Sequence, residues 1–390
     1  MRITRVETLR ASRFTYVKVY TDEGIAGVGE LHPAGSTVGS RPFTALAGVE
    51  NFAEYLVGKD PLQIERHWQH LFRRCLFRGG ADTMAAIGTL DMALWDIKGK
   101  AAGLPVYSLL GGPTREKVRL YTHLQGDTPE ELAEHARACV EDGFTAVRMY
   151  PFGHFGKTDF ERGHGLETMS LRRMTREAVA RVEAVRDAIG PDIDLMIDVV
   201  NRLTPAEAIE VGRALEPYGL YFFEDPIEPE NPDVLAHVAA RVPMPVAAGE
   251  RLYTIYQFKD LLNHLRAGYV RPDLSLAGGI TNCRKIATLA EAYYVGTIPH
   301  NPLSCVLTAA CVQLDAAIQL VPVQEYPGDE YDRPKVDLVK EPLKREGGYM
   351  IVPDTPGLGI ELNEEAFTHY PPERYDRPAL VGPDGALRDY

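Results

Sequence analysis

Cysteine is scarce in this 390-residue chain: the five cysteines are odd in number, and no two have a CxxC spacing. This pattern argues against a disulfide framework and predicts reduced thiols packed in the core. No uninterrupted apolar stretch reaches the length of a membrane span. The residues Met1–Arg5 lead straight into a strand-like pattern, without a basic-then-apolar signal segment. We therefore expect a cytoplasmic protein with no membrane partner.

The chain also has no excess of basic residues, since its formal net charge is −13. This acidic balance argues against a nucleic-acid partner, because phosphates attract basic surfaces. It does not exclude an anionic substrate, because a metal ion and a few local Arg or His residues can reverse the sign in a pocket. The apolar and charged fractions, 45% and 25%, are those of a soluble globular protein. The length is sufficient for two domains.

The N-terminal part predicts an α+β domain. Phe14–Tyr20 alternates apolar and polar residues, Asp22–Gly24 supplies a turn, and Ile25–Glu30 returns as a second strand. Residues 44–77 have helical spacing, and residues 85–100 have the composition of a buried helix. Strands followed by helices are typical of this fold class.

After Pro113 the pattern changes to strands that alternate with helices. Helical stretches such as residues 204–216, with Thr-Pro at the start, lie between most of the strands. This number of β/α units favours a closed β/α barrel, and an open doubly wound sheet is the weaker alternative. The eight predicted strands are residues 118–123, 146–150, 195–199, 221–224, 246–248, 269–270 with an extension to 274, 295–298 and 321–325.

Three carboxylates follow apolar runs at equal intervals. Asp198 and Glu224 are 26 residues apart, and Glu224 and Glu250 are again 26 residues apart. This interval is the length of one β/α unit, so we expect the three acids side by side at the same ends of neighbouring parallel strands. Carboxylates so close together repel unless a cation lies among them, and hard oxygen ligands suit Mg²⁺. The spacing therefore predicts a metal site and an enzyme.

The series continues with Asp273, His300 and Glu325, at further intervals of 23, 27 and 25 residues. In a barrel, catalytic groups gather at such strand ends. Asp273 beside His300 would fix the tautomer of the imidazole and strengthen it as a base. Glu325, if protonated, would donate a hydrogen bond to an oxygen near the metal. Arg148 and Tyr150 lie two residues apart, on one face of the second strand, and would point into the barrel mouth.

Two further segments have no simple place in a barrel. The connection between residues 151 and 191 is unusually long and holds His154 and His164 before a helix that starts near Met169. Long loops in compact domains are often lids, so these histidines are candidate substrate contacts, although a surface excursion is the simpler interpretation of each. About sixty residues follow Glu325, and we expect this tail to pack on the N-terminal domain.

The arrangement resembles the enolase superfamily, specifically its mandelate racemase-like group and the acid-sugar dehydratases of the galactonate type. The order and spacing of the matching segments are specific, although each alone is weak. They are Leu90-Asp-Met-Ala-Leu-Trp-Asp-Ile-Lys-Gly-Lys, Leu109-Leu-Gly-Gly, Phe223-Glu-Asp-Pro, Ala248-Gly-Glu-Arg-Leu, Arg271-Pro-Asp-Leu, Gly278-Gly-Ile-Thr, Pro299-His-Asn-Pro-Leu and Thr355-Pro-Gly-Leu-Gly.

The resemblance implies a modified (β/α)8 TIM-type barrel, (β/α)7β, over residues 116–328. An α+β capping domain, residues 1–115, would be completed by the C-terminal segment, residues 329–390. Loops near residues 31–41 and 77–80 would shape specificity, and the protein would be a homo-oligomer, as relatives commonly are.

The resemblance also implies the roles of the site residues. Asp198, Glu224 and Glu250 would hold one Mg²⁺ per subunit, which would bind a substrate carboxylate and stabilise an enediolate; this pairing of a base with Mg²⁺ is known for the superfamily. His300 would be the base, oriented by Asp273. The enediolate oxygen would be stabilised by Glu325, and the substrate would be bound by His300, Glu325, Arg148, Tyr150 and His154.

Two departures from the family pattern leave the reaction open. Many relatives have a lysine on the second strand, where this chain has Arg148 and Tyr150, and arginine is a poor base. Both remain candidate catalytic residues: Tyr150 would be a base if Arg148 lowers its proton affinity, or the acid for the leaving group, and otherwise both would bind substrate oxygens. Galactonate dehydratases have a histidine two residues after the first metal ligand, where this chain has Val200. A Mg²⁺-dependent sugar-acid dehydratase that forms a 2-keto-3-deoxy acid is the leading hypothesis. The alternatives are a racemase, epimerase or ring-opening cycloisomerase acting through the same enediolate, and a non-catalytic sugar-acid binder.

Overall fold

The computed structural model describes residues 1–32, 43–76, 78, 80–152, 169–264, 268–373, 380–381 and 384–388. The chain forms two compact units, each built from separate stretches of the sequence. Unit 1 comprises Met1–Arg119, Glu250–Lys259 and Arg271–Asp376, and unit 2 comprises Leu120–Gly249, Asp260–Val270 and Arg377–Tyr390. The predicted domain boundaries at residues 115/116 and 328/329 stay a prediction.

Unit 1 begins with an antiparallel sheet in the order β1-β2-β3. Its strands are β1 (Ile3–Ala11), β2 (Phe14–Thr21) and β3 (Ala26–Glu30). The predicted hairpin of β2 and β3 is present, and its turn contains Gly24 with a left-handed φ of 78°, which glycine adopts without steric cost. Because Tyr16 and Glu30 are partners in the register, both lie at the same end of the hairpin.

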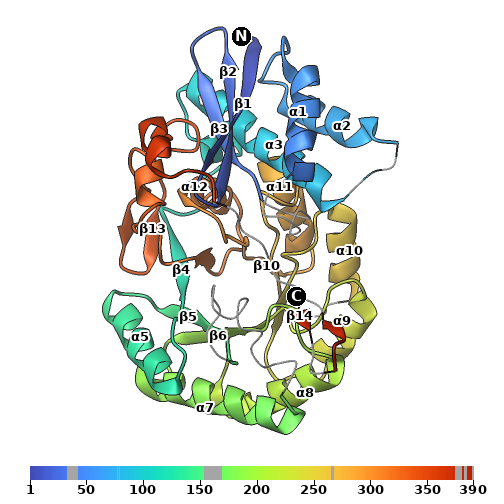
Figure 1. Cartoon of the computed structure of the whole chain (residues 1–390), viewed down its shortest axis with the longest axis vertical. Coiled ribbons are helices and arrows are strands. Elements are labelled where there is room, and N and C mark those ends of the chain that lie inside the picture. Colours follow the sequence, from blue (N-terminus) through green and yellow to red (C-terminus); the bar gives the residue numbers. More distant parts are fainter. Residues whose placement is uncertain are drawn as a thin grey trace. The chain divides into compact units, whose positions relative to one another are not determined.

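Helix α3 packs directly on this sheet (Figure 1). The helices of this region are α1 (Phe43–Leu56), α2 (Ile64–Arg74), α3 (Ala81–Ala102) and α4 (Val106–Leu109). Gly27 and Gly29 of β3 permit the close approach, since a Cβ atom there would lie 2.1 Å from the carbonyl oxygen of Ala93 and 2.0 Å from that of Thr89. The buried side chains of α1, α2, α3 and the sheet form one hydrophobic core.

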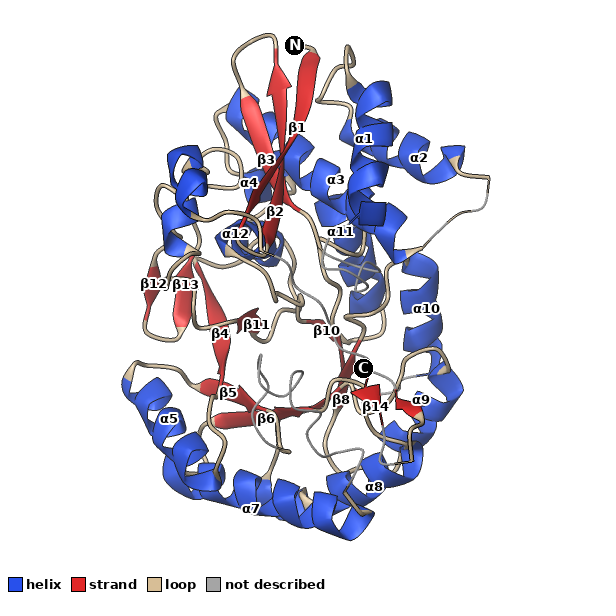
Figure 2. Ribbon diagram, viewed as in Figure 1, coloured by secondary structure: helices blue, strands red, loops and turns tan. Residues whose placement is uncertain are grey.

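Unit 2 is built on parallel strands that pair in chain order, β4-β5-β6-β7-β8-β9. These strands are β4 (Lys117–His123), β5 (Ala146–Met149), β6 (Asp194–Asp198), β7 (Phe223–Glu224), β8 (Val246–Ala248) and β9 (Gly268–Val270). The connecting helices are α5 (Pro129–Glu141), α7 (Leu171–Ile189), α8 (Pro205–Ala214), α9 (Pro232–Ala239) and α10 (Ile255–His264). Figure 2 shows α5, α7 and α8 along the outer side of these strands. Because a helix connects each strand to the next, the strands are parallel and their carboxyl ends, where the predicted acids lie, are at the same edge of the sheet.

The local sequence explains where these helices begin. Thr204 and Pro205 form the predicted cap of α8, and Glu207 completes a capping box by accepting from Thr204 N while Thr204 accepts from Glu207 N. Thr128 does the same for α5. Each helix therefore starts directly after the loop that follows a strand end.

The remaining elements of unit 1 follow the barrel pattern and end in the tail. They are β10 (Gly296–Thr297), β11 (Gln324–Tyr326), α11 (Gly279–Glu291), α12 (Cys305–Asp315), β12 (Arg345–Glu346) and β13 (Tyr349–Ile351). In the tail, β13 pairs antiparallel with residues 117–119 of β4. A short pair, β14 (Leu380–Val381) and β15 (Leu387–Arg388), belongs to unit 2.

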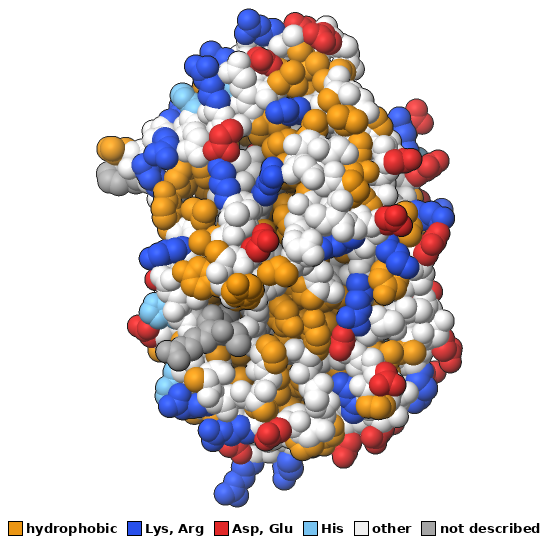
Figure 3. Space-filling view, turned by 180° about the vertical axis from the view of Figure 1, so that it is seen from behind, with side chains coloured by type: hydrophobic (Ala, Val, Ile, Leu, Met, Phe, Trp, Pro, Cys, Tyr) orange, Lys and Arg blue, Asp and Glu red, His pale blue; other side chains and the backbone are white. Residues whose placement is uncertain are grey.

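The distribution of surface charges and the state of the cysteines agree with the expectations from the amino-acid composition. On the face drawn in Figure 3, acidic and basic side chains are interspersed. All five cysteines are free, and four of them are buried, as predicted. Among the described residues, none of the helices combines the length and the apolar composition needed to span a bilayer.

Candidate active site

Two predicted metal ligands lie at the ends of adjacent strands in unit 2. Asp198 ends β6 and Glu224 ends β7, and the two residues are partners in the parallel register. Both are buried, with exposures of 6% and 0%. Glu224 is also paired with Ala247 of β8, and Glu250 lies three residues after Ala247 in the chain. The equal spacing in the sequence therefore corresponds to consecutive parallel strands.

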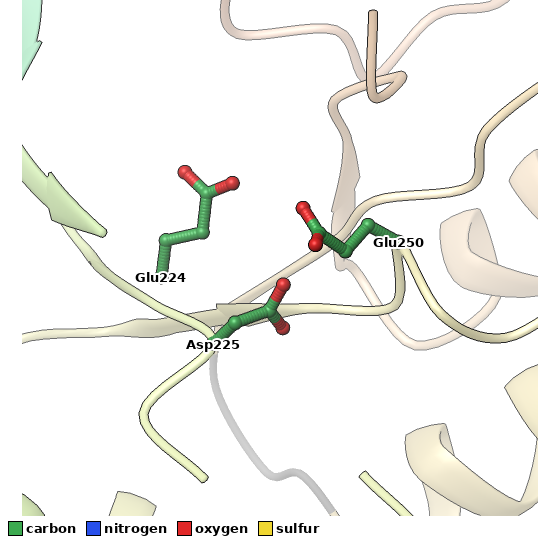
Figure 4. A group of neighbouring side chains, drawn as sticks. All are labelled: Glu224, Asp225 and Glu250. Carbon is green, nitrogen blue, oxygen red and sulfur yellow. The ribbon is translucent and has the colours of Figure 1, made fainter. Parts of the chain in front are cut away.

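Figure 4 draws three carboxylates that can serve as metal ligands: Glu224 and Asp225 after β7, and Glu250 after β8. Asp225 was not predicted as a ligand, although it directly follows Glu224. Its backbone has a left-handed φ of 41°. Its N–H donates to Ala247 O at 2.9 Å, and its carbonyl accepts from Asn201 N at 2.7 Å. This strand end thus carries two adjacent hard oxygen donors, which suit Mg²⁺.

The guanidinium of Arg148, on β5, lies between Asp198 and Glu224. Its Nη1 donates to Asp198 Oδ2 and to Glu224 Oε1, each at 2.9 Å. Two carboxylates therefore converge on one cationic nitrogen, and a divalent cation would satisfy the same electrostatic demand. The donor set consists of carboxylate oxygens, so the residues fit Mg²⁺.

His123 closes β4 and was missed by the sequence-based prediction. Its Nδ1 lies 3.5 Å from Arg148 Nη2, and its ring stacks on Tyr121 with 6.0 Å between the centroids. The signal that could have found it is the one used for His300, a histidine at the end of a barrel strand.

Tyr150 follows β5 directly, and its hydroxyl accepts a hydrogen bond from Arg202 Nη1 at 3.1 Å. Arg202, four residues after Asp198 in the chain, is thus a partner of Tyr150. Of the predicted pair on β5, Arg148 contacts two acids and Tyr150 contacts an arginine. The candidate substrate contacts His154 and His164 lie outside the described residues.

The predicted catalytic pair forms within unit 1. Asp273 and His300 are joined by a parallel β-bridge, and His300 Nδ1 lies 2.9 Å from Asp273 Oδ2. The other oxygen of Asp273 accepts from Ser275 N at 2.7 Å, Ser275 Oγ at 2.6 Å and Leu276 N at 3.1 Å. His300 Nε2 lies 3.3 Å from Glu250 Oε2. An ionised Asp273 fixes the proton on Nδ1, which leaves Nε2 as the basic nitrogen.

The acids around His300 govern its pKa. Burial disfavours the imidazolium, but Glu250, Glu325 and Asp273 outweigh burial and raise the pKa of His300 to about 10. Burial also disfavours the Asp273 carboxylate, yet His32 and His300 hold the pKa of Asp273 below its ordinary value. The pKa of Glu250 is likewise lowered, because the charges of His300 and two arginines outweigh its burial.

Glu325 is an ion-pair partner. Its Oε2 accepts from Arg271 Nη2 at 2.5 Å and from Asn301 N at 3.0 Å. The sequence suggested a protonated Glu325 that donates a hydrogen bond, whereas in the structure this oxygen accepts from a fully buried guanidinium. Arg271 was quoted only as part of a family motif, and its charge favours the ionised carboxylate.

His32, just beyond β3, was also missed. Its Nε2 lies 3.8 Å from Asp273 Oδ2, the same oxygen that His300 contacts. His32 thus brings the start of the predicted specificity loop to Asp273, while residues 33–42 lie outside the described part of the chain, and the role of this loop in specificity stays a prediction. The strand pattern carried no signal for this contact.

Comparison with known proteins identifies the family of the chain and its fold class. Residues 2–111 match the family model described as mandelate racemase / muconate lactonizing enzyme, N-terminal domain, and residues 131–366 match the one described as enolase C-terminal domain-like. The chain belongs to this family of the enolase superfamily. The predicted resemblance and the predicted fold class, a (β/α)7β barrel with an α+β cap, are confirmed.

The individual relatives narrow the class to dehydratases. The chain is 38% identical to a D-galactonate dehydratase of Variovorax paradoxus, with 100% of both chains covered, and 39% identical to one of Ralstonia nicotianae, with 93% of both covered. A solved enolase from Agrobacterium radiobacter, with Na and L-malate bound, matches with a TM-score of 0.89 at 30% identity over 100% of both chains. The chain is an enzyme, a hydro-lyase of the enolase superfamily.

Proposed function

We propose that the protein is a Mg²⁺-dependent sugar-acid dehydratase that forms a 2-keto-3-deoxy acid and water. The single observation that carries the proposal is the pair of Asp273 and His300, with Nδ1 held at 2.9 Å and Nε2 directed at Glu250. A proton beside a carboxylate is weakly acidic, so its removal needs an oriented base and stabilisation of the resulting negative charge.

Asp198, Glu224 and Glu250 would hold one Mg²⁺ per subunit. The support is the strand register, the carboxylate donor set, and the position of Arg148 Nη1 between two of the three acids. When bound, the ion supplies Lewis-acid stabilisation of a substrate carboxylate and of the charge that develops on it. Asp225 is a further oxygen donor at the same strand end.

A cation held by Glu250 would offset part of the negative charge that raises the pKa of His300, so that Nε2 would be available as a base. His300 Nε2 would then take the proton from the carbon next to the substrate carboxylate, and Asp273 would stabilise the imidazolium. The C–O bond at the next carbon then breaks, and the departing hydroxyl takes the proton back from His300 to leave as water. The remaining enol becomes the 2-keto acid, so the reaction needs no oxidant or reductant. Arg148, Tyr150 and His154 would bind substrate oxygens.

Glu325 would act on the enediolate through its neighbours. Its Oε2 is held by Arg271 and Asn301, so negative charge near the enediolate oxygen would be balanced by the buried guanidinium.

A second candidate, an epimerase or a cycloisomerase that opens an anhydro ring through the same enediolate, is favoured by Val200. This residue stands where galactonate dehydratases have the acid for the leaving hydroxyl, and its N–H donates to Asp198 Oδ1 at 2.8 Å. Ring opening expels an ether oxygen, and His300 alone could protonate it. A non-catalytic binder is the third candidate, and the intact pair of Asp273 and His300 argues against it.

Three further features belong to the proposal. A cytoplasmic location suits five free thiols. The substrate is a small sugar acid, with neither nucleic acid nor a membrane as partner, and the protein is a homo-oligomer. The three-part domain division at residues 115/116 and 328/329 is also proposed.

A library of aldonates and aldarates, with D-galactonate included, tests the proposal. Each compound is incubated in D₂O with the enzyme and either Mg²⁺ or EDTA, and proton NMR follows the products. A 2-keto acid that forms with Mg²⁺ and not with EDTA supports the dehydratase. Loss of the signal next to the carboxylate without loss of water points to an epimerase or cycloisomerase. No change with any compound contradicts both.

A further inference from the structure

Glu30, the last residue of β3, is fully buried and reaches the start of a distant helix. Its Oε2 accepts from Ser304 Oγ at 2.8 Å, Ser304 N at 3.2 Å and Leu307 N at 3.1 Å. Tyr16, its partner in the register, has its hydroxyl 3.0 Å from Ser304 Oγ. The first sheet of unit 1 thus supplies a cap to α12 from 274 positions away in the sequence.

Capping this helix with a buried carboxylate has a desolvation cost. Ser304 already serves as the N-cap, since its side chain accepts from Val306 N. A carboxylate loses its hydration on burial, and this desolvation raises the pKa of Glu30 to about 7 although Ser304 and Leu307 donate to it. The carboxylate instead reaches the N–H groups of Ser304 and Leu307, whereas the Ser304 side chain accepts from Val306 N.

The segment between His300 and Ser304 is held by hydrogen bonds from Asn301 to residues of β11 and α12. Asn301 N donates to Glu325 Oε2 at 3.0 Å, and Asn301 Nδ2 donates to Thr308 Oγ1 at 2.7 Å and to Glu325 O at 3.1 Å. Asn301, the residue after His300, is therefore hydrogen-bonded both to β11 and to Thr308 of α12. A shift of the first turn of α12 moves the backbone that carries the imidazole.

The same end of β3 also reaches the partner of His300. His32 lies two residues after Glu30, and its Nε2 is 3.8 Å from Asp273 Oδ2. The segment from Glu30 to His32 thus contacts Asp273 on one side and, through Ser304, the loop of His300 on the other.

We propose that Glu30 is a positioning residue for His300: it holds the N-terminal turn of α12 and so sets the direction of the imidazole. The inference rests on the proposed function, because it takes His300 as the base. A misplacement of about 1 Å in a catalytic group can reduce the rate by about 10²-fold. Loss of the Glu30 contacts is therefore expected to lower turnover much more than substrate affinity.

Two substitutions of Glu30 and one matched control test this role. Glu30→Ala removes the acceptor, whereas Glu30→Gln retains an oxygen acceptor of the same reach. Asp96→Asn is the control, because Asp96 is also a fully buried acid of unit 1 and accepts from Val28 N at 3.1 Å and Leu358 N at 2.9 Å. The contacts described for Asp96 do not include the loop of residues 300–304.

The readouts are kcat, KM and the urea midpoint, measured with the sugar acid that the wild-type enzyme turns over. We expect Glu30→Ala to lower kcat by about 10- to 100-fold with KM changed less than about 3-fold, and Glu30→Gln to recover most of the rate. Asp96→Asn lowers the urea midpoint and leaves kcat within about 2-fold of wild type. An unchanged kcat in Glu30→Ala, or an equal loss of kcat in Asp96→Asn, overturns the proposal.

Histidine-selective ¹⁵N NMR separates this inference from the proposed function, since it needs no substrate. The ring signal of His300 is assigned by its absence in His300→Asn. We expect this signal to shift in Glu30→Ala and to stay in place in Asp96→Asn. If no sugar acid is turned over, the proposed function fails, but the NMR result still decides: an unmoved His300 signal in Glu30→Ala refutes the positioning role.

Discussion

At the scale of single residues, the candidate site consists of buried acids that differ in how their charge is balanced. Asp273 has backbone and hydroxyl donors on one oxygen and a histidine on the other. Glu325 faces a buried arginine. Asp198 and Glu224 share the guanidinium of Arg148. Each acid has a different set of partners, so substitutions of these partners have different consequences.

Replacement of Arg148 tests the balance between guanidinium and metal. Arg148→Gln leaves Asp198 and Glu224 without their shared cation, so we expect the metal-free protein to lose about 3 kcal/mol of unfolding free energy. Mg²⁺ would replace the lost charge, so the rise in Tm on adding Mg²⁺ should be larger than in wild type. Thermal unfolding with EDTA and with Mg²⁺ measures both effects.

The matched control for this experiment is Arg186→Gln. Arg186 is also an arginine of unit 2, but it donates to backbone carbonyls, including those of Tyr218, Gly190 and Ile193. This variant should lose stability and show the wild-type response to Mg²⁺. An identical response to Mg²⁺ in both variants would mean that Arg148 and the ion do not share the two acids.

The predicted and the missed site residues differ in what determines their positions. Asp198, Glu224, Asp273 and His300 were predictable because a β/α unit has a nearly constant length, so strand ends recur at regular intervals. His32 was not predictable, because its contact with Asp273 comes from a loop whose course depends on tertiary packing.

At the scale of elements, strand cores were predictable and their ends were not. The predicted strand of residues 295–298 is present only as Gly296–Thr297, and that of residues 221–224 only as Phe223–Glu224. Both begin later than predicted, although Tyr221 N donates to Leu195 O at 2.8 Å and Phe222 O accepts from Ile197 N at 3.3 Å just before β7. At the start of α11, Gly278 and Gly279 have left-handed φ values of 81° and 79°.

This glycine pair allows a matched stability test. A Cβ on Gly279 would lie 2.4 Å from Asp91 Oδ2, whereas Gly24, with a similar φ of 78°, has open space around it. We expect Gly24→Ala to cost about 1 kcal/mol, from backbone strain alone. Gly279→Ala should cost about 1–3 kcal/mol more, from the clash. Urea unfolding of the two variants measures the difference, and equal losses would argue against close packing of α11 on α3.

At the scale of the whole molecule, buried acids in unit 1 make stability depend on pH. Burial raises the pKa of Glu30, Asp91 and Glu330 to about 7. These values exceed the ordinary carboxyl values, so the folded state holds these protons more tightly than the unfolded state. Their contribution to stability is complete below about pH 4 and is lost as the pH rises through about 7.

Glu330→Gln isolates one of these groups. Glu330 accepts from the Thr308 hydroxyl, with Lys335 and Asp329 nearby. Glutamine keeps an acceptor for Thr308 and cannot ionise. Between pH 4.5 and 7 we expect the unfolding free energy of this variant to fall less steeply, by up to about 1.4 kcal/mol per pH unit. Urea unfolding over this range measures the slope, and a slope equal to that of wild type would show that Glu330 is ionised throughout.

The most direct test of the central claim is the fate of the proton next to the substrate carboxylate in His300→Asn. In D₂O with Mg²⁺, wild-type enzyme should give a 2-keto-3-deoxy acid with one deuterium at carbon 3. The variant should bind Mg²⁺ with an affinity close to wild type by calorimetry. It should lose turnover and exchange of the proton next to the carboxylate by about 10²- to 10⁴-fold. Turnover of His300→Asn at the wild-type rate would contradict the account.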